Sequence, residues 1–488
     1  MTVDQRPKPT RVVIIGAGMS GILAAIKLME DGITDFCIYD KGDSIGGTWR
    51  DNRYPGLACD VPAHSYTYSF EPYAEWSQHF APGPEIREYF EGVVDKYGVR
   101  DYLRLNQRLD SLEFKEGRWH LAMASGLTDV ADFVIAATGV LHYPKYPDIP
   151  GLSSFRGPIM HSAEWDEKVD LEGKTVAVIG TGSTGVQIVS ALTGKSRVKH
   201  FQRSAQWMLH VPNAPFSELE KQAFRDDPEL LKSMQNPPEL QEAVLAFTDA
   251  IMDANSEGVK EISRGTLDYL ESAIVDPDLK ERLRPTYLAA CKRLIRSPDY
   301  YQSIQHADNE LVDAAIEAIE PAGIRTVDGV LHEVDIIALA TGFHADRFLR
   351  PARVIGRGGK NLDEAWSVRP TAYMATSIPS FPNLAFLNGP TGPVGNFSVI
   401  DISEHQMGYI RQLISLVRSG RCKEVCATEQ AHSDYEKERI ASAKNTVFGS
   451  GCSSWYLDPE GVPTAWPWSM QRFFDEMSEL RMNDYELV

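Results

Sequence analysis

Two glycine-rich turns, each placed directly after a run of β-branched residues, limit the folds open to this chain more than any other feature. The first run, residues 12–15, reads VVII and leads into the turn GAGMSG at residues 16–21. Continuous β-branched runs are typical of strands buried on both faces of a parallel sheet. The apolar spacing after the turn predicts a helix, and a second strand, residues 36–39, ends at Asp40. The segment therefore predicts a β-α-β unit.

The three glycines of this first turn have separate roles. Gly16 permits the tight turn, Gly18 lets a pyrophosphate approach the backbone, and Gly21 lets the helix pack closely on the strand. The amino terminus of the helix offers N–H groups to phosphate oxygens, and Ser20 is a further candidate contact there. Asp40 stands where a carboxylate can accept hydrogen bonds from a ribose 2′-hydroxyl. These positions together predict a dinucleotide site.

The same pattern recurs at residues 175–185, where TVAVI leads into GTGSTG. A helix and a strand, residues 198–201, follow, and Arg203 then takes the station that Asp40 has in the first unit. A carboxylate repels a 2′-phosphate whereas a guanidinium binds it, so the first site should take an unphosphorylated nucleotide such as FAD and the second should take NADP(H). Arg203 as a solvated charge at a strand end stays open as an alternative. The candidate cofactor contacts of this turn are Gly180, Thr181, Gly182, Ser183, Thr184 and Gly185.

Two buried strands that end in Ala-Thr-Gly, at residues 132–139 and 335–342, follow the two turns and indicate an internal repeat. Residues 213–285 lengthen the second unit and are rich in Glu, Lys, Leu and Ala with interrupting prolines, which favours a helical insertion. A Pro-rich linker at residues 142–151 marks a boundary near residue 150. The predicted fold class is α/β, with two nested Rossmann-like, doubly wound domains and a helical insertion in the second. The expected divisions are residues 1–150 and 346–488 for FAD binding, 151–212 and 286–345 for NADP binding, and 213–285 for the insertion.

The overall composition is that of a core-forming globular protein, with 43 % hydrophobic and 24 % charged residues. The net charge of −19 argues against sequence-independent nucleic-acid binding and against docking on anionic lipid. No apolar run reaches the ~20 residues needed to cross a bilayer. Six scattered cysteines are too few for a disulfide scaffold, so we expect a reducing, cytoplasmic location. No metal site is expected.

Two longer motifs carry a resemblance to a known family. Residues 155–166, FRGPIMHSAEWD, fit the fingerprint FxGxxxHxxxW(P/D), and GGTW at 46–49 is followed by YPG at 54–56 and then by Asp60. The chain thereby resembles the class B flavoprotein monooxygenases, and within them the type I Baeyer–Villiger monooxygenases, over nearly its whole length. N-hydroxylating and microsomal-type relatives usually carry Tyr or Phe in place of the fingerprint Trp. The resemblance implies FAD contacts at Gly47, Thr48, Trp49, Asp60 and Tyr66.

His161, inside the fingerprint, has two interpretations. From the residues alone it is an ordinary hydrogen-bonded histidine, and the resemblance makes it a linker residue that couples the two domains. Neither interpretation makes it catalytic.

The resemblance also selects Arg293, in the segment CKRLIRS at residues 291–297. It implies that Arg293 is the active-site arginine, that Asp60 is the active-site aspartate, and that Lys292 joins Arg203 and Ser204 around the 2′-phosphate. Without the resemblance, a Lys-Arg pair is most typical of a solvated face. Arg296 competes for the guanidinium role.

The implied reaction begins with hydride transfer from NADPH to FAD, followed by a C4a-peroxide that attacks the carbonyl of a small-molecule ketone and yields an ester or lactone. Arg293 suits it because a guanidinium stays protonated at any working pH. Three alternatives stay open: oxygenation of nitrogen or sulfur in a small substrate such as a sulfide, a disulfide reductase, and a nucleotide sensor without turnover. A reductase needs a close cysteine pair beside the flavin, which Cys37 and Cys59 do not supply. The sequence gives no indication of the oligomeric state.

The C-terminal third predicts less. Residues 381–390 are similar to a strand that returns the chain to the FAD domain, and the loop up to Asn396 is expected near the flavin ring. Residues 452–456, Trp466 and Trp468 resemble a mobile loop and substrate wall, although three tryptophans also suit a core.

Overall fold

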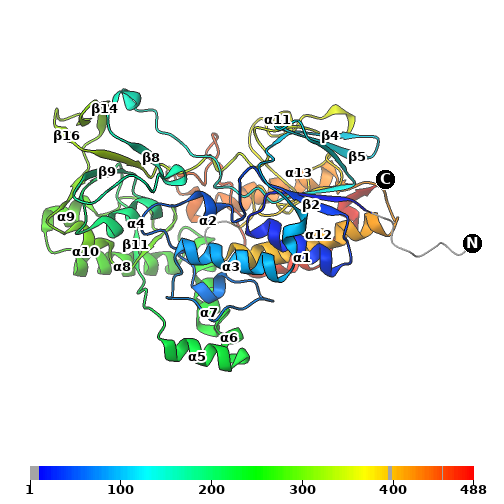
Figure 1. Cartoon of the computed structure of the whole chain (residues 1–488), viewed down its shortest axis with the longest axis horizontal. Coiled ribbons are helices and arrows are strands. Elements are labelled where there is room, and N and C mark those ends of the chain that lie inside the picture. Colours follow the sequence, from blue (N-terminus) through cyan, green and yellow to red (C-terminus); the bar gives the residue numbers. More distant parts are fainter. Residues whose placement is uncertain (1–9, 394–397, 453) are drawn as a thin grey trace, which may run out of the picture.

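A computed structural model describes residues 10–393, 398–452 and 454–488. The chain forms two lobes, each built on a five-stranded parallel sheet (Figure 1). The expected loop segment around Asn396 lies outside the described residues. The predicted α/β class with two parallel sheets is confirmed.

The first lobe, at the right of Figure 1, contains the first glycine-rich turn. Its strand β1 is completely buried and pairs in parallel with β2 on one side and β7 on the other. The strand order is β19 (Leu384–Phe386), β7 (Phe133–Ala136), β1 (Val12–Ile15), β2 (Phe36–Tyr39) and β3 (Leu103–Arg104). Because β19 pairs with β7, the chain returns to this lobe after completing the second one.

Helices and a second, mostly antiparallel sheet surround that first sheet. Helix α1 packs on α12, and α12 on α14, so the C-terminal helices complete the core around the first turn. The helices are α1 (Met19–Glu30), α2 (Thr48–Asp51), α3 (Gly83–Lys96), α11 (Leu362–Ala365), α12 (Val399–Arg418), α13 (Glu429–Ala443) and α14 (Met470–Ser478). The accessory strands are β4 (Leu109–Lys115), β5 (Arg118–Met123), β6 (Thr128–Ala131), β18 (Arg353–Ile355), β20 (Val425–Ala427) and β21 (Tyr485–Leu487).

The second lobe, at the left of Figure 1, contains the second glycine-rich turn. Its strand order is β13 (Asn309–Val312), β10 (Arg197–Phe201), β9 (Thr175–Ile179), β17 (Ile336–Leu339) and β8 (Ile159–His161). The family fingerprint therefore supplies an edge strand of this sheet. The remaining elements are α4 (Ser183–Leu192), α10 (Tyr300–Ile304), β11 (Met208–His210), β12 (Ile295–Ser297), β14 (Ile316–Glu320), β15 (Gly323–Thr326) and β16 (Leu331–Glu333).

Residues 218–282 contain five helices, and α5 and α6 protrude at the foot of the molecule (Figure 1). They are α5 (Glu218–Asp226), α6 (Pro228–Ser233), α7 (Pro238–Ile251), α8 (Glu257–Ala273) and α9 (Pro277–Arg282). This arm also reaches the first lobe, where Arg225 pairs with Glu75 and the side chain of Asn213 accepts the main-chain N–H of Phe80 at 2.8 Å. The insertion therefore connects the two lobes at a second place.

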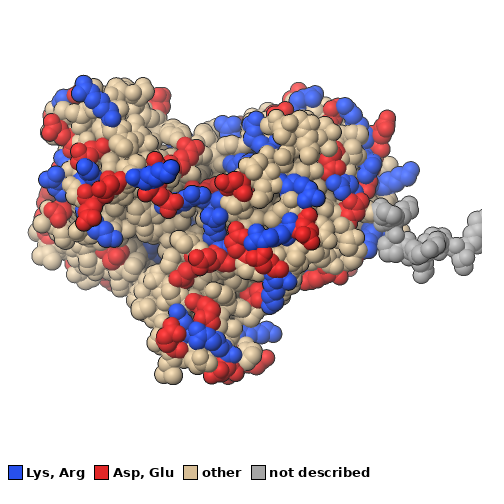
Figure 2. Space-filling model, in the orientation of Figure 1, with Lys and Arg blue, Asp and Glu red and all other residues tan. Residues whose placement is uncertain are grey.

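Lys and Arg side chains alternate with Asp and Glu over the face seen in Figure 2. Among the described residues, no helix combines the length and the apolar character needed to cross a membrane. The described part of the chain also contains no cluster of His, Cys, Asp and Glu arranged to hold a metal ion.

The cysteines differ from the sequence expectation. Cys291 and Cys452 form a disulfide across 161 positions of sequence, while Cys37, Cys59, Cys422 and Cys426 are free and buried. The sequence could not indicate this pair because neither cysteine has a partner at local spacing. A single disulfide between two distant segments agrees with the absence of a disulfide scaffold, but it was not expected from the sequence.

Candidate active site between the two lobes

The first glycine-rich turn is closed so tightly that larger side chains could not occupy it. Gly16 has a φ of +109°, and a Cβ added there would lie 2.4 Å from the carbonyl oxygen of Ala137. A Cβ on Gly21 would lie 1.9 Å from the oxygen of Gly16. Helix α1 begins after Gly18 with no side-chain cap, so its first N–H groups remain available to a ligand.

The GGTW segment lies directly against this turn. A Cβ added to Gly47 would come within 3.1 Å of the Cα of Gly18. Gly47 has a φ of +54° and leads into α2, whose first two residues are Thr48 and Trp49. The indole N–H of Trp49 donates to the hydroxyl of Tyr66 at 3.1 Å. The structure therefore brings four of the expected FAD contacts to one place.

Ser20 takes part in a buried network below the turn. Its hydroxyl lies 3.1 Å from that of Ser403 on α12, and the side-chain N–H₂ of Asn388 donates to both hydroxyls at 2.8 Å. This network fixes α1 against α12 at the amino-terminal end of α1.

Asp40 lies at the end of β2, as expected, but the chain itself uses most of its carboxylate. The carboxylate accepts the main-chain N–H groups of Ala17 and Gly42 and the guanidinium of Arg50, all at 2.7 Å. A carboxylate has about four acceptor positions, so roughly one remains for a ribose hydroxyl. Asp40 therefore holds the turn in shape in addition to its expected ligand role.

The second turn has the same construction. Gly180 has a φ of +118°, and a Cβ on Gly185 would lie 1.9 Å from the Gly180 oxygen. A Cβ on Gly182 would meet nothing within 4 Å, which leaves open space at the helix end. Helix α4 begins at Ser183 without a side-chain cap. Thr181 is nearly buried and donates to the carbonyl oxygen of Ser204 at 3.2 Å, and Thr184 is the second residue of the helix.

Two cations gather beside this second turn. The ammonium of Lys292 donates to the hydroxyl of Ser204 at 3.2 Å. The residue before Ser204 in the sequence is Arg203, which is exposed. Burial and the positive charge of Arg203 lower the pKa of Lys292. A phosphate bound between the two cations would relieve their repulsion. The cluster is therefore chemically suited to a 2′-phosphate.

Arg293 and Asp60 form a two-pronged ion pair where the lobes meet. The Nη2 of Arg293 lies 2.8 and 2.6 Å from the two carboxylate oxygens, and its Nε lies 3.1 Å from Oδ2. Burial alone would raise the pKa of Asp60, but the charges of Arg293 and Arg296 and the hydrogen bond from Arg293 lower it. The carboxylate in turn raises the pKa of Arg293. Both groups are therefore charged at neutral pH.

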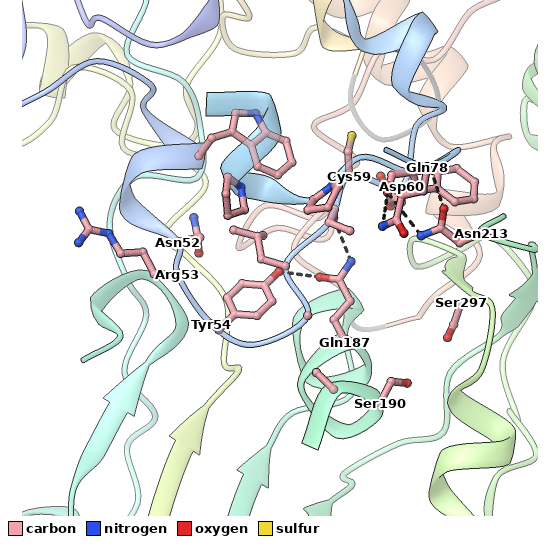
Figure 3. Close-up of a pocket in the computed structure, with 18 of the residues that line it drawn as sticks. Asn52, Arg53, Tyr54, Cys59, Asp60, Gln78, Gln187, Ser190, Asn213 and Ser297 are labelled. Carbon is pink, nitrogen blue, oxygen red and sulfur yellow. Dashed lines mark hydrogen bonds between the residues drawn. The ribbon is translucent and has the colours of Figure 1, made fainter. Parts of the chain in front are cut away.

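The loop that carries Asp60 is hydrogen-bonded to helix α4 of the second lobe. Tyr54 donates to the side-chain oxygen of Gln187 on α4 at 2.8 Å, and the side-chain N–H₂ of Gln187 donates to the carbonyl of Ala58 at 3.0 Å (Figure 3). Gly56, with a φ of +79°, lies so close to α4 that an added Cβ would be 2.7 Å from the main-chain oxygen of Gln187. The YPG motif is thus explained by close packing between the lobes.

Beside this loop lies a pocket of about 830 Å³, whose lining residues Figure 3 shows in close-up. Its wall includes Asp60, Gln78, Gln187, Asn213 and Arg296, which come from both lobes and from the base of the helical arm. The glycines of the two nucleotide turns do not line it. The pocket therefore adjoins the ion pair from a side other than the nucleotide turns.

His161 is a buried structural contact. Its Nε2 hydrogen-bonds the carbonyl of Gly342 at 3.0 Å, while Nδ1 accepts the main-chain N–H of Ala163 at 3.2 Å. These partners fix the ring at the end of β8, next to the second Ala-Thr-Gly segment. The geometry suits the linker interpretation and offers no proton-transfer partner among the described residues.

The sequence made Arg296 a competitor for the guanidinium role, but it indicated neither the contact of Arg296 with Asp60 nor a tyrosine near the ion pair. Arg296 donates from Nη1 to the main-chain carbonyl of Asp60 at 3.0 Å. Tyr456, in the C-terminal segment, is buried, and its burial raises the pKa of its phenol while the charge of Arg293 lowers it. Trp466 and Trp468 pack against the core of the first lobe, whereas Trp455 is 46 % exposed. The core interpretation therefore holds for the two later tryptophans.

The residues present fit two dinucleotides. Each glycine-rich turn leaves open helix N–H groups, and the cation cluster stands beside the second turn.

Known proteins resemble this chain along nearly its whole length. Residues 13–220 match the family model described as pyridine nucleotide-disulphide oxidoreductase. A Baeyer–Villiger monooxygenase of Streptomyces coelicolor is 36 % identical, covering 99 % of this chain and 94 % of that protein. A second one, of Pseudomonas aeruginosa, is 35 % identical, with coverage of 97 % and 91 %.

Solved structures show the same likeness in three dimensions. The cyclohexanone monooxygenase of Rhodococcus sp. Phi1 bound to NADP⁺ superposes with a TM-score of 0.87 at 27 % identity, and the match covers 99 % of both chains. Relatives above 30 % identity along nearly the full length establish membership, so the chain belongs to the Baeyer–Villiger monooxygenase family of flavoproteins.

Proposed function

We propose that this chain inserts one oxygen atom from O₂ into a small-molecule ketone, with FAD and NADPH as cofactors, and releases an ester or lactone. The observation that carries the proposal is the Arg293–Asp60 pair, a fixed positive charge at the junction of two dinucleotide-binding lobes. The sequence kinship with Baeyer–Villiger monooxygenases supports the same reaction.

FAD, when bound and reduced by NADPH, supplies the activation of O₂ that no side chain provides alone. Gly16, Gly18, Gly21 and Ser20 would hold its pyrophosphate at the start of α1, with Asp40 toward the ribose. The remaining proposed FAD contacts, which lie beside that turn or in the loop after it, are Gly47, Thr48, Trp49, Asp60 and Tyr66.

NADPH would occupy the second turn, residues 180–185, at the start of α4. Arg203, Ser204 and Lys292 would surround its 2′-phosphate, because they already lie together without it. Lys292 and Arg293 are adjacent in sequence, so the phosphate site and the charged centre are joined by one peptide bond.

Arg293 would stabilise the negative charge that develops on oxygen during attack on the ketone and in the tetrahedral adduct. A guanidinium cannot give up its proton at working pH, so it stabilises this charge without quenching it by protonation. Asp60 would orient the guanidinium through its paired contacts and offset the cost of placing a charge away from water.

The direct test incubates the purified flavoprotein with NADPH and a panel of linear, cyclic and aryl ketones under isotopically labelled O₂. We expect an ester or lactone whose mass shows one labelled oxygen atom. If NADPH is consumed but hydrogen peroxide is the sole oxygen product with every ketone, the proposal is wrong. A sulfoxide from an added aryl sulfide, with no ester from any ketone, would also contradict it.

A further inference from the structure

His64 lies in a single helical turn of the first lobe, Ala63–Tyr66, and its side chain is only 3 % exposed. Neither of its ring nitrogens has a hydrogen-bond partner within the described residues. A neutral imidazole has one N–H donor and one acceptor nitrogen, and buried groups of this kind are nearly always paired. A buried histidine with both nitrogens unpaired therefore has a special environment.

Two phenylalanines of the helical arm cover the ring of His64. Phe216 precedes α5 and Phe224 lies within it, and their ring centroids are 5.2 and 4.9 Å from that of the imidazole. The two phenyl rings also contact each other, with centroids 5.7 Å apart. A neutral imidazole packs well between such rings, whereas a protonated one would lose its hydration there without compensation.

Main-chain contacts attach the arm to the first lobe at the same place. The residues around Pro215 pair antiparallel with those around Gln78. The N–H of Phe216 donates to the carbonyl of Ser77 at 2.9 Å, and the N–H of His79 donates to the carbonyl of Ala214 at 3.0 Å. We call these contacts, together with the seat of His64, the arm junction.

The charged groups of the arm junction do not favour a positive imidazole at His64. No carboxylate within the described ranges accepts a hydrogen bond from either ring nitrogen. His79 acts electrostatically on His64, and two positive imidazoles would repel each other. The remaining charged side chains have partners of their own: Lys221 with Glu218, Arg225 with Glu75, Glu220 with Ser217, and Glu85 of α3 with the N–H of Ser77.

The docked arm consequently changes the proton affinity of His64. Burial and the charge of His79 lower the pKa of His64 from its ordinary value of 6.5 to about 4. In a released arm the solvated ring would regain its ordinary pKa, so docking is fully favoured above pH 6.5 and weakens as the pH falls toward 4. The Arg225–Glu75 pair stays charged over this range, because the hydrogen bond from Arg225 lowers the pKa of Glu75.

We propose that His64 makes the docking of the helical arm depend on protonation: the neutral imidazole seats Phe216 and Phe224, and the protonated imidazole releases them. The inference goes beyond the proposed function and does not depend on it. It concerns the second connection between the lobes, and His64 lies between Asp60 and Tyr66, two of the proposed FAD contacts. Acid would therefore loosen the arm and this loop without acting on the nucleotide turns.

Hydrogen–deuterium exchange of the purified flavoprotein tests the proposal without turnover. The amides of Phe216 and His79 are direct reporters, because each donates across the arm junction. Between about pH 8 and about pH 5.5 their protection factors should fall about tenfold, as follows from a pKa of about 4 in the docked state and 6.5 in the released state. A change of less than twofold in the wild type would overturn the proposal.

Two variants assign the change to one histidine. His64→Phe keeps an aromatic ring in the seat but cannot take up a proton, so its protection factors should be nearly equal at the two pH values. His79→Gln is the matched control, because His79 joins the arm through its main chain, and it should keep most of the fall. A tenfold fall in His64→Phe, or no fall in His79→Gln, would overturn the proposal. If His64→Phe does not fold, a fall that persists in both wild type and His79→Gln still supports His64, and a fall lost in His79→Gln still overturns it.

Discussion

Arg296 donates from Nη1 to the main-chain carbonyl of Asp60 at 3.0 Å, while Arg293 holds the carboxylate of the same residue. Two arginines three positions apart therefore grip Asp60 at its backbone and at its side chain. Both positive charges lower the pKa of Asp60 against the raising effect of burial. The arrangement favours the ionised carboxylate in the folded protein and makes stability depend on pH in a defined direction.

We expect Asp60→Asn to lower the free energy of unfolding by about 2 kcal/mol at neutral pH. Breaking a fully buried pair costs ~3–5 kcal/mol, and the smaller figure applies because these side chains are 19 % and 30 % exposed. The pKa of Asp60 in the folded protein lies below its ordinary value of 3.8. The ion pair therefore stabilises the fold fully above pH 3.8, and this stabilisation is lost as the pH falls through the folded pKa.

Urea unfolding of both proteins at a series of pH values checks this. The difference should be constant from about pH 5 to pH 8 and should shrink below about pH 4. The matched control is Asp35→Asn, whose carboxylate is 57 % exposed and pairs with Arg11, so we expect a loss below about 1 kcal/mol. A difference that grows on acidification would contradict the assigned ion pair.

Arg293→Ala should separate the two halves of the proposed reaction. The nucleotide turns are untouched, so NADPH should still reduce the flavin at a rate near that of the wild type. Removing a comparable oxyanion donor costs about 3–4 kcal/mol of transition-state stabilisation, so ester formation should fall at least a hundredfold. Stopped-flow flavin absorbance and product chromatography measure the two rates. Ester formation at the wild-type rate would remove Arg293 from the mechanism.

Arg203→Ala should change the choice between the two nicotinamide cofactors. The cluster of Arg203, Ser204 and Lys292 lies where a 2′-phosphate would bind, and NADH has no such group. We expect KM for NADPH to rise at least tenfold with KM for NADH nearly unchanged. Arg197→Ala is the control, because Arg197 is an exposed arginine at the start of β10, the strand that ends two positions before Arg203. An equal rise for both cofactors would contradict phosphate recognition by Arg203.

The sequence predicted the parts of the molecule that depend on local patterns. The two turns need glycine because a Cβ at Gly21 or Gly185 would lie 1.9 Å from a carbonyl oxygen, and such constraints are visible in the order of residues. The hydrogen-bond partners of Asp40 were harder to predict from the sequence, because Arg50 reaches Asp40 only after the chain has turned at Gly47. Local patterns therefore located the turns but did not reveal which groups Asp40 satisfies within the chain.

Contacts between distant segments left no trace in any local pattern. Tyr456 and Cys291 share one buried cluster because the C-terminal segment packs on the segment that carries Arg293, and neither residue has a spacing that indicates the other. Cys291 and Cys452 illustrate the same limit, because their pairing depends on how that segment docks.

The Cys291–Cys452 bond gives a final prediction, which also tests how the C-terminal segment is held. In denatured, unreduced protein we expect four reactive thiols, and six after treatment with a reductant. Cys452→Ser should lower the free energy of unfolding, because a cross-link over 161 positions removes about 5 kcal/mol of chain entropy from the unfolded state in the loop-closure model. Cys422→Ser, at a free buried cysteine, is the control and should change stability by less than about 2 kcal/mol.

Thiol titration with a chromogenic disulfide reagent measures the number of free thiols, and urea unfolding measures the change in stability. Six thiols in the unreduced protein, or equal stability of Cys452→Ser and wild type, would show that the bond does not stabilise the fold.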